Sequence, residues 1–336
     1  MRIYTTCPPS KGISGTDYLP MVRDIARWSD RAGCEGILVY TDNGLVDPWL
    51  VSQVIIQATR RLCPLVAVQP VYMHPYAVAK MVASLAHLHG RAVHLNMLAG
   101  GFRNDLIALG DDTEHDERYR RTVEYTRIVM ALLRDEGPVT VDGQYYTVKG
   151  LRLRPKVPAE LLPDVLVSGS SPAGREAARA LDATAVKYPQ PPGQEIEWMT
   201  DGLTGGFGIR VGIVARDTTD EAWRVAHERF PTDRSGQITH RLAMAVSDSH
   251  WHGQLSGDEH AGPDLDGEPD PYWLGPFQNY RTFCPYLVGS YDRVARMLSH
   301  YMDLGTSTFI LDVPPSEEEL AHCAVVFAKA QEMVTT

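Results

Sequence analysis

The sequence predicts an α/β protein with the fold of a TIM (β/α)8 barrel that carries insertions. Strand-like and helix-like patterns alternate almost from end to end of the 336 residues, and eight strand patterns stand out. The length agrees with one barrel plus insertions. We therefore expect a single domain over residues 1–336, built on a closed parallel barrel rather than an open sheet.

The first half of the barrel follows from helix starts and stops between short strands. The expected strands are 3–6, 36–40, 65–71 and 92–98. After the first strand, Asp17 is a candidate N-cap and Gly33 ends the helix that it begins. Asp47 and Pro48 open the helix after the second strand, and 75–88 is the helix after the third.

The second half repeats the alternation and adds two features outside it. The expected strands are 165–167, 183–187, 208–214 and 308–312, and the expected helices are 115–134, 217–229, 291–304, 316–333 and one that begins at Pro172. Within 139–146, an Asp-Gly pair between apolar runs indicates a hairpin outside the barrel. Segment 231–286 is dense in Gly, Asp, His and Pro without clear periodicity, and we expect it to be a mobile lid.

The composition describes a globular, acidic chain. It is 44% hydrophobic and 22% charged, with a net charge of −10, which disfavours nucleic acid or an anionic membrane as a partner. It has no apolar run of about twenty residues, and it enters a strand at once instead of a signal peptide. We expect a cytoplasmic protein without a membrane segment.

The sequence contains no recognisable metal-binding or nucleotide-binding motif. The five cysteines are odd in number and widely separated, which is typical of free thiols in a reducing compartment, and none forms a pair at metal-ligand spacing. Neither a G-x-G-x-x-G fingerprint nor a Walker loop is present, so a Rossmann nicotinamide site is unsupported. We expect no metal site.

One strand–turn–helix junction is the strongest candidate binding element. An apolar run ends in Gly169, Ser170 and Ser171, and a helical pattern begins at Pro172. The free N–H groups of a helix start, with two hydroxyls beside them, suit a phosphate dianion. The same residues also make an ordinary N-cap, and the junction alone does not decide between the two.

The remaining strand ends carry polar groups without a hydrolytic constellation. In a barrel the active groups lie at the C-terminal ends of the strands. The candidates there include Thr41, Asp42, Asn43, Gln69, Asn96, Lys187, Tyr188 and Arg210. They contain no zinc-protease motif, no convincing pair of carboxylates and no nucleophile elbow. We expect a cofactor to carry out the difficult chemistry.

Several motifs in a fixed order carry a family resemblance. They are Thr41 followed by 47–51, 90–96 leading to Gly100, 115–119, 169–171, 207–210, 217–223 and 287–289. With these motifs the chain resembles the bacterial luciferase-like flavin monooxygenases over nearly its whole length. Within that family it is most similar to the alkanesulfonate monooxygenase branch.

The resemblance implies a two-component monooxygenase. Such enzymes bind reduced FMN (FMNH2) supplied by a separate NAD(P)H-dependent flavin reductase, and O2 as co-substrate adds at flavin C4a. The resulting peroxyflavin inserts one oxygen atom into a small organic substrate, here expected to be anionic, either sulfonate-like or a biosynthetic intermediate. The resemblance also implies a homodimer or homotetramer.

The resemblance assigns four residues to the flavin phosphate. His115 and Tyr119 at one helix start, with Ser170 and Ser171 at another, would hold it. Helix N-termini and hydroxyl donors independently favour a dianion. The alternative for His115 and Tyr119 is a helix cap and a packed aromatic ring.

Five further residues are placed along the flavin ring or on the substrate. Thr41 and Asn96 would lie beside the ring or the ribityl chain, although the Asn96 amide is equally suited to a neighbouring group. Arg210 and Arg281 would clamp an anionic substrate, with a surface salt bridge as the alternative for Arg281. Tyr188 would donate a hydrogen bond or form a wall of the pocket.

The substrate side departs from the sulfonate enzymes. Gly212 stands where they carry a histidine, and Val313 stands where they carry a tyrosine. The flavin half is kept and the substrate half is changed. Two alternatives stay open: an F420-dependent oxidoreductase of the same barrel superfamily, and a non-catalytic flavin-binding protein.

Overall fold

The computed structural model describes residues 1–191, 203–245 and 270–334. Its barrel strands are β1 (Arg2–Thr6), β2 (Gly36–Val39), β3 (Cys63–Val68), β4 (His94–Leu98), β7 (Val165–Ser168), β8 (Thr184–Lys187), β9 (Phe207–Arg216) and β12 (Thr306–Leu311). The strands are parallel and close into an eight-stranded barrel, so the predicted TIM-barrel class is confirmed. The helix after Pro48 and the helix over 115–134 also begin where the sequence predicts.

The described chain has further strands and helices besides these eight strands. The strands outside it are β5 (Val139–Asp142), β6 (Thr147–Leu151), β10 (Tyr272–Trp273) and β11 (Tyr286–Ser290). The helices are α1 (Gly15–Arg31), α2 (Pro48–Ala58), α3 (Pro75–His89), α4 (Arg103–Ala108), α5 (His115–Arg134), α6 (Pro172–Leu181), α7 (Thr219–Arg229), α8 (Arg234–Ala245), α10 (Gly275–Gln278), α11 (Tyr291–Asp303) and α12 (Glu317–Val334), with a 3₁₀ turn at Ala159–Leu161. In the described residues, no helix has the length and apolarity to cross a membrane.

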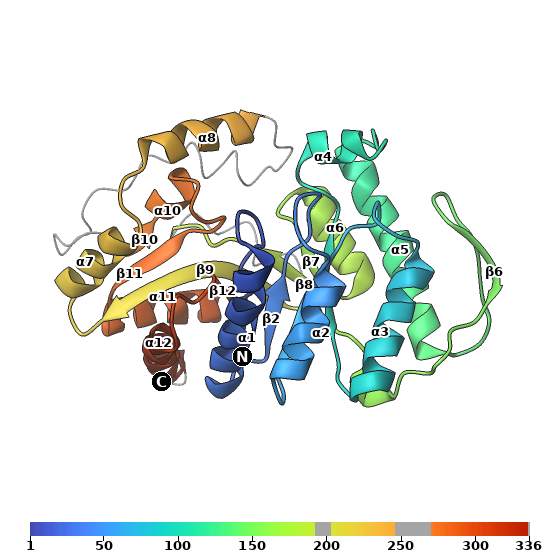
Figure 1. The fold of residues 1–336 in the computed structure, drawn as a ribbon, viewed down its shortest axis with the longest axis horizontal. Coiled ribbons are helices and arrows are strands. Elements are labelled where there is room, and N and C mark those ends of the chain that lie inside the picture. The colour runs from blue at the N-terminus through green and yellow to red at the C-terminus, as the bar shows by residue number, and fades with distance from the viewer. Residues whose placement is uncertain (192–202, 246–269, 335–336) are drawn as a thin grey trace. The chain divides into compact units, whose positions relative to one another are not determined.

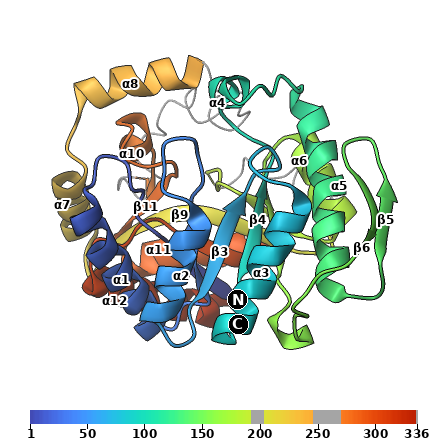
Figure 2. The same cartoon turned by 45° about the vertical axis from the view of Figure 1, so that its right-hand side comes forward.

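The chain divides into two compact units. The first comprises Cys7–Val186 and Leu203–Gly205, and we call it the flavin-side unit after the residues that the sequence analysis expects to hold a flavin. Its strands run in the order β2–β3–β4–β7–β8, all parallel, with Leu65 opposite His94 and Asn96 opposite Leu166. Every residue of β2 and β3 is buried, as expected for parallel strands covered on both faces. In Figures 1 and 2, α2 and α3 run beside these strands. The predicted hairpin is present as β5 and β6.

The second unit comprises Met1–Thr6, Lys187–Gly202 and Gly206–Thr336, and we call it the substrate-side unit after the residues that the sequence analysis expects to contact the substrate. Its strands run in the order β10–β11–β9–β12–β1. The first part of β9 pairs with β12, where Arg210 lies opposite Ile310, and the second part pairs with β11, from Gly212 opposite Tyr286. Figure 1 shows β9 as a long curved strand beside β11. Gly212 therefore marks the point at which β9 changes partner.

Some predicted boundaries were wrong for local reasons. The N-cap of α1 is Ser14 and not Asp17, because the Ser14 hydroxyl accepts from the Asp17 N–H and itself donates to Asp17 Oδ2 at 2.6 Å. The short helix α4 was missed; its N-cap makes no side-chain hydrogen bond.

The segment 231–286 is more regular than its composition indicates. It contains α8, β10 and α10, and residues 246–269 lie outside the described part of the chain. The Asp233 carboxylate accepts from the Gly236 N–H at 2.9 Å, which is a start signal for α8 that the sequence does contain. That the segment is a mobile lid stays a prediction.

Candidate functional site

The junction between β7 and α6 has the geometry of an anion-binding helix start. Ser171 is the N-cap of α6 with an extended backbone, and its hydroxyl accepts from the Gly174 N–H at 3.2 Å. Pro172 occupies the first helical position. The other N–H groups of this first turn have no partner within the helix, because the first turn of any helix lacks preceding carbonyls. Ser170 is half-buried in the same turn.

Tyr119 from α5 packs into this junction. Its hydroxyl lies 3.5 Å from the Ser168 carbonyl oxygen, and a Cβ on Gly169 would overlap that hydroxyl. Burial raises the pKa of Tyr119, and a hydrogen bond with the Ser171 side chain acts in the opposite direction. A glycine at 169 is thus required for the tyrosine to reach the start of α6.

His115 and Arg118 complete the cluster from the start of α5. The His115 ring lies edge-to-face with Tyr119 at 5.2 Å between centroids, and its Nδ1 is 2.7 Å from Asp116 Oδ1. Arg118 is buried and donates to the carbonyl oxygens of Thr113 at 2.9 Å and Gly100 at 3.4 Å. The sequence analysis missed Arg118, although it lies within the quoted motif 115–119.

This cluster fits a phosphate dianion by its donor set. It combines a helix N-terminus, the hydroxyls of Ser171 and Tyr119, an imidazole and a buried guanidinium whose described partners are carbonyl oxygens. The contacts bring together His115, Tyr119 and Ser171, with Ser170 adjoining. Its residues all belong to the flavin-side unit.

Asn96 and Thr41 are placed differently. Asn96 is buried in β4, and its Oδ1 accepts from the Ser168 hydroxyl at 2.7 Å, which places it next to the end of β7. Thr41 is half-buried in the loop after β2. In that loop Asn43 accepts from the Tyr72 hydroxyl at 2.9 Å and donates to the Asp105 carbonyl oxygen at 3.0 Å. Asn96 adjoins the junction, and no described contact links the Thr41 loop to it.

The substrate-side unit gathers a second polar group around Arg210. Arg210 is buried in β9, and its Nη2 lies 3.5 Å from Oδ1 of Asp312, the residue that follows β12. The Arg210 Cζ is 6.0 Å from the centroid of the Tyr188 ring. Arg210 therefore has a carboxylate partner that the sequence analysis overlooked, although Asp312 ends a predicted strand.

Tyr286 holds the other oxygen of that carboxylate. Its hydroxyl donates to Asp312 Oδ2 at 2.8 Å, and a Cβ on Gly212 would overlap its ring. Burial, and then the negative charge of Asp312, raises the pKa of Tyr286 well above its usual value. The histidine that the sulfonate enzymes carry would not fit at Gly212, because the Tyr286 ring fills that space.

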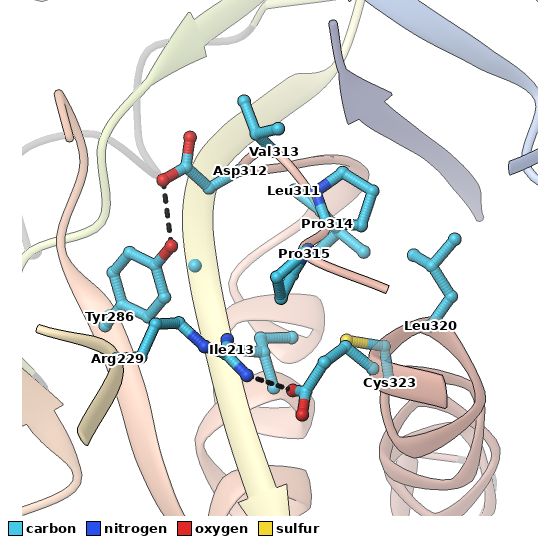
Figure 3. Close-up of a pocket in the computed structure, with 12 residues that line it drawn as sticks. Ile213, Arg229, Tyr286, Leu311, Asp312, Val313, Pro314, Pro315, Leu320 and Cys323 are labelled. Carbon is cyan, nitrogen blue, oxygen red and sulfur yellow. Dashed lines mark hydrogen bonds and ion pairs between the residues drawn. The ribbon is translucent and has the colours of Figure 1, made fainter. Parts of the chain in front are cut away.

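Tyr286 and Asp312 also line a small pocket (Figure 3). Arg229 and Glu319 line it as well, and their Nη2 and Oε2 are 2.7 Å apart. Tyr286 donates to Asp312, and Glu319 forms ion pairs with both Arg229 and Arg216. The pocket is consequently a poor choice for an ionic ligand, and we do not assign the site to it.

Arg281 forms an ion pair at the surface of the substrate-side unit. Its side chain is 56% exposed, and its Nη2 lies 2.7 Å from Asp233 Oδ2. An ion pair of this kind is the alternative that the sequence analysis gives for Arg281, and its role on an anionic substrate stays a prediction. The predicted arginine clamp is not assembled by the described contacts.

Comparisons with known proteins give a consistent result. The model of the luciferase-like monooxygenase family matches residues 1–308. The chain is 33% identical over 302 residues to BtrO of Niallia circulans, a 4-(γ-L-glutamylamino)butanoyl-[BtrI acyl-carrier protein] monooxygenase, covering 89% of this chain and 87% of the relative.

Two solved structures share the fold. The oxygenating constituent of 3,6-diketocamphane monooxygenase from Pseudomonas putida, in complex with FMN, has a TM-score of 0.68 at 16% identity, with 97% of this chain and 96% of that chain covered. An F420-dependent secondary alcohol dehydrogenase with an F420-acetone adduct has a TM-score of 0.67 at 15% identity, with 98% of each chain covered. At these identities the two structures show the fold alone.

Proposed function

Since the chain belongs to the luciferase-like monooxygenase family, and so is an enzyme of the monooxygenase class, we propose that it is the oxygenating component of a two-component system. It uses reduced FMN delivered by an NAD(P)H-dependent flavin reductase, with O2 as co-substrate. When bound, reduced FMN supplies the electrons with which O2 is activated, so that one oxygen atom enters the acceptor and the other leaves as water. The non-catalytic alternative is set aside by the family.

The phosphate-type cluster at the starts of α5 and α6 is the observation that supports FMN most directly. Ser171 and the first-turn N–H groups of α6 would bind the phosphate oxygens, Tyr119 and His115 would donate from the side, and Arg118 would compensate charge. Asn96 and Thr41 stay predicted contacts of the ring or ribityl chain. The role of these residues in holding the cofactor is part of the proposal.

Rapid mixing of the protein with reduced FMN and O2 tests this function. We expect the protein to slow the reoxidation of reduced FMN, because a bound flavin is shielded from free solution. Since a fold relative uses F420, a binding titration with reduced FMN and with F420 belongs beside it. Unchanged reoxidation kinetics, or tight binding of F420 without affinity for reduced FMN, would contradict the proposal.

The acceptor class follows from the curated relative. BtrO acts on an acyl group attached to an acyl-carrier protein, and we extend this to an acyl thioester as acceptor here. Incubation with a panel of acyl thioesters, reduced FMN and O2 should give a product whose mass has increased by one oxygen atom. The alkanesulfonate branch and the dimeric or tetrameric state stay predictions.

A further inference from the structure

The substrate-side unit contains an arginine whose charge is already balanced. The side chains of Arg210 and Asp312 are only 9% and 12% exposed, and their charged groups are 3.5 Å apart. At such burial an ion pair is weakly screened, so the carboxylate cancels most of the field of the guanidinium and would repel a second anion at the same place.

Asp312 is also fixed in place by its second oxygen. The Tyr286 hydroxyl donates to it at 2.8 Å, and the Tyr286 ring is confined by Gly212 on β9 and by the Phe230 ring at 4.9 Å between centroids. Both carboxylate oxygens therefore have partners from different strands. This geometry holds Arg210 as an oriented donor rather than as a mobile charge.

The neighbouring polar group is a neutral hydroxyl. Tyr188 packs against the hydrophobic cluster that contains Tyr286 and Cys284. Burial raises the pKa of Tyr188 above its usual range, and the negative charge of Asp312 acts in the same direction. The Tyr188 side chain, whose ring centroid lies 6.0 Å from Arg210 Cζ, is thus an uncharged neighbour of the Arg210–Asp312 pair.

We propose that Asp312 is a positioning residue that balances Arg210 and orients Tyr286, so that the acceptor group received beside Arg210 and Tyr188 is a neutral carbonyl, amide or hydroxyl rather than an anion. The inference rests on the proposed function and sharpens it, since it replaces the anionic acceptor of the sequence analysis at this position. A thioester or amide carbonyl meets this requirement.

Calorimetric titration of the protein alone with methanesulfonate, a small anion, tests the inference. Wild type and Arg210→Gln should bind it with the same low affinity. Asp312→Asn keeps an acceptor for Tyr286 but leaves Arg210 uncompensated, so its affinity should rise at least about tenfold, the value of a hydrogen bond to a charged group. The double variant Asp312→Asn/Arg210→Gln should lose this gain, and Asp312→Glu, which retains the charge, should not show it.

Asp233→Asn is the matched control. It removes the carboxylate partner of Arg281, but that pair is exposed, so anion affinity should stay at the wild-type level. Arg210-dependent binding of methanesulfonate to wild type, or no gain in folded Asp312→Asn, overturns the inference. The comparison of wild type with Arg210→Gln does not require the Asp312 variant to fold. Binding of reduced FMN, measured on the same samples, reports on the proposed function separately.

Discussion

The flavin-side and substrate-side units differ in the partners of their positively charged side chains. Around the start of α6, the donors are N–H groups, hydroxyls and the Arg118 guanidinium, which donates to the carbonyl oxygens of Thr113 and Gly100. Around Arg210, each positive charge faces a carboxylate: Arg210 faces Asp312, and Arg229 faces Glu319. The first arrangement suits a dianion, whereas the second leaves little net attraction for one.

Removing Glu319 should produce the largest effect. The Glu319 carboxylate contacts both Arg216 and Arg229 and is buried, so Glu319→Gln leaves two arginines without their carboxylate. We expect a loss of about 3–5 kcal/mol in the free energy of unfolding, measured by urea denaturation at pH 7. Glu228→Gln is the control, because its pair with Arg224 is exposed and is expected to contribute about 0.3–0.5 kcal/mol. Equal losses of unfolding free energy in the two variants would contradict the expected difference between a buried and an exposed ion pair.

The pH dependence of the same pair has a definite sign. Burial raises the pKa of Glu319, but its hydrogen bonds to Arg216 and Arg229 outweigh burial and lower it overall. A carboxyl whose pKa is lowered on folding binds fewer protons when folded, so its stabilisation is present above its unfolded pKa of about 4.3 and is lost as the pH falls further. The difference between wild type and Glu319→Gln should shrink below about pH 4 in the same urea assay.

Gly212→Ala should disturb the substrate-side unit next most strongly. The added Cβ overlaps the Tyr286 ring, and relieving that overlap costs about 1–3 kcal/mol of unfolding free energy. Gly289→Ala on β11 is the matched control, since its nearest neighbour would be 3.5 Å away, an ordinary contact. Thermal unfolding separates the two variants. Because Gly212 lies outside the flavin-side unit, a large loss of affinity for reduced FMN in Gly212→Ala would argue against dividing the functions between the units.

Tyr119→Phe should weaken the flavin side by a smaller amount. It deletes the hydroxyl that contacts Ser171, and a hydrogen bond of this kind contributes about 0.5–1.5 kcal/mol, so the Kd for reduced FMN should rise by up to roughly tenfold. Tyr125→Phe on the same helix is the control, because its hydroxyl donates to the Met73 carbonyl oxygen instead. If both variants bind reduced FMN equally well, the Tyr119 hydroxyl does not contribute to the site.

The parts of the site that sequence predicts are those whose residues lie close together along the chain. His115 and Tyr119 are one helical turn apart, and Ser171 is the N-cap of a helix whose start is indicated by Pro172. Asp312 and Tyr286 were missed because their meeting depends on the register of β9 against β12 and β11. No local pattern encodes that register.

The same reason explains the fold. Buried parallel strands and capped helices give repeated local signals, so the barrel was predicted. The strand β11 pairs with 212–216, the part of β9 that continues beyond its pairing with β12, and its other partner β10 has only two residues. Neither strand was predicted. β10 lies within the expected loop 231–286 and β11 begins at its last residue, and composition alone does not reveal a pairing that forms in the folded state.

Arg281→Ala is expected to have the smallest effect on stability. Its ion pair with Asp233 is more than half exposed on the arginine side, and such pairs contribute about 0.2–1 kcal/mol. Urea denaturation should therefore place it near Glu228→Gln and far from Glu319→Gln. The affinity for reduced FMN should match that of wild type, since Arg281 lies in the substrate-side unit. A loss of several kcal/mol in the free energy of unfolding would mean that this arginine is buried against a group other than Asp233. The difference in charge between the two units would then no longer be described by the ion pairs given above.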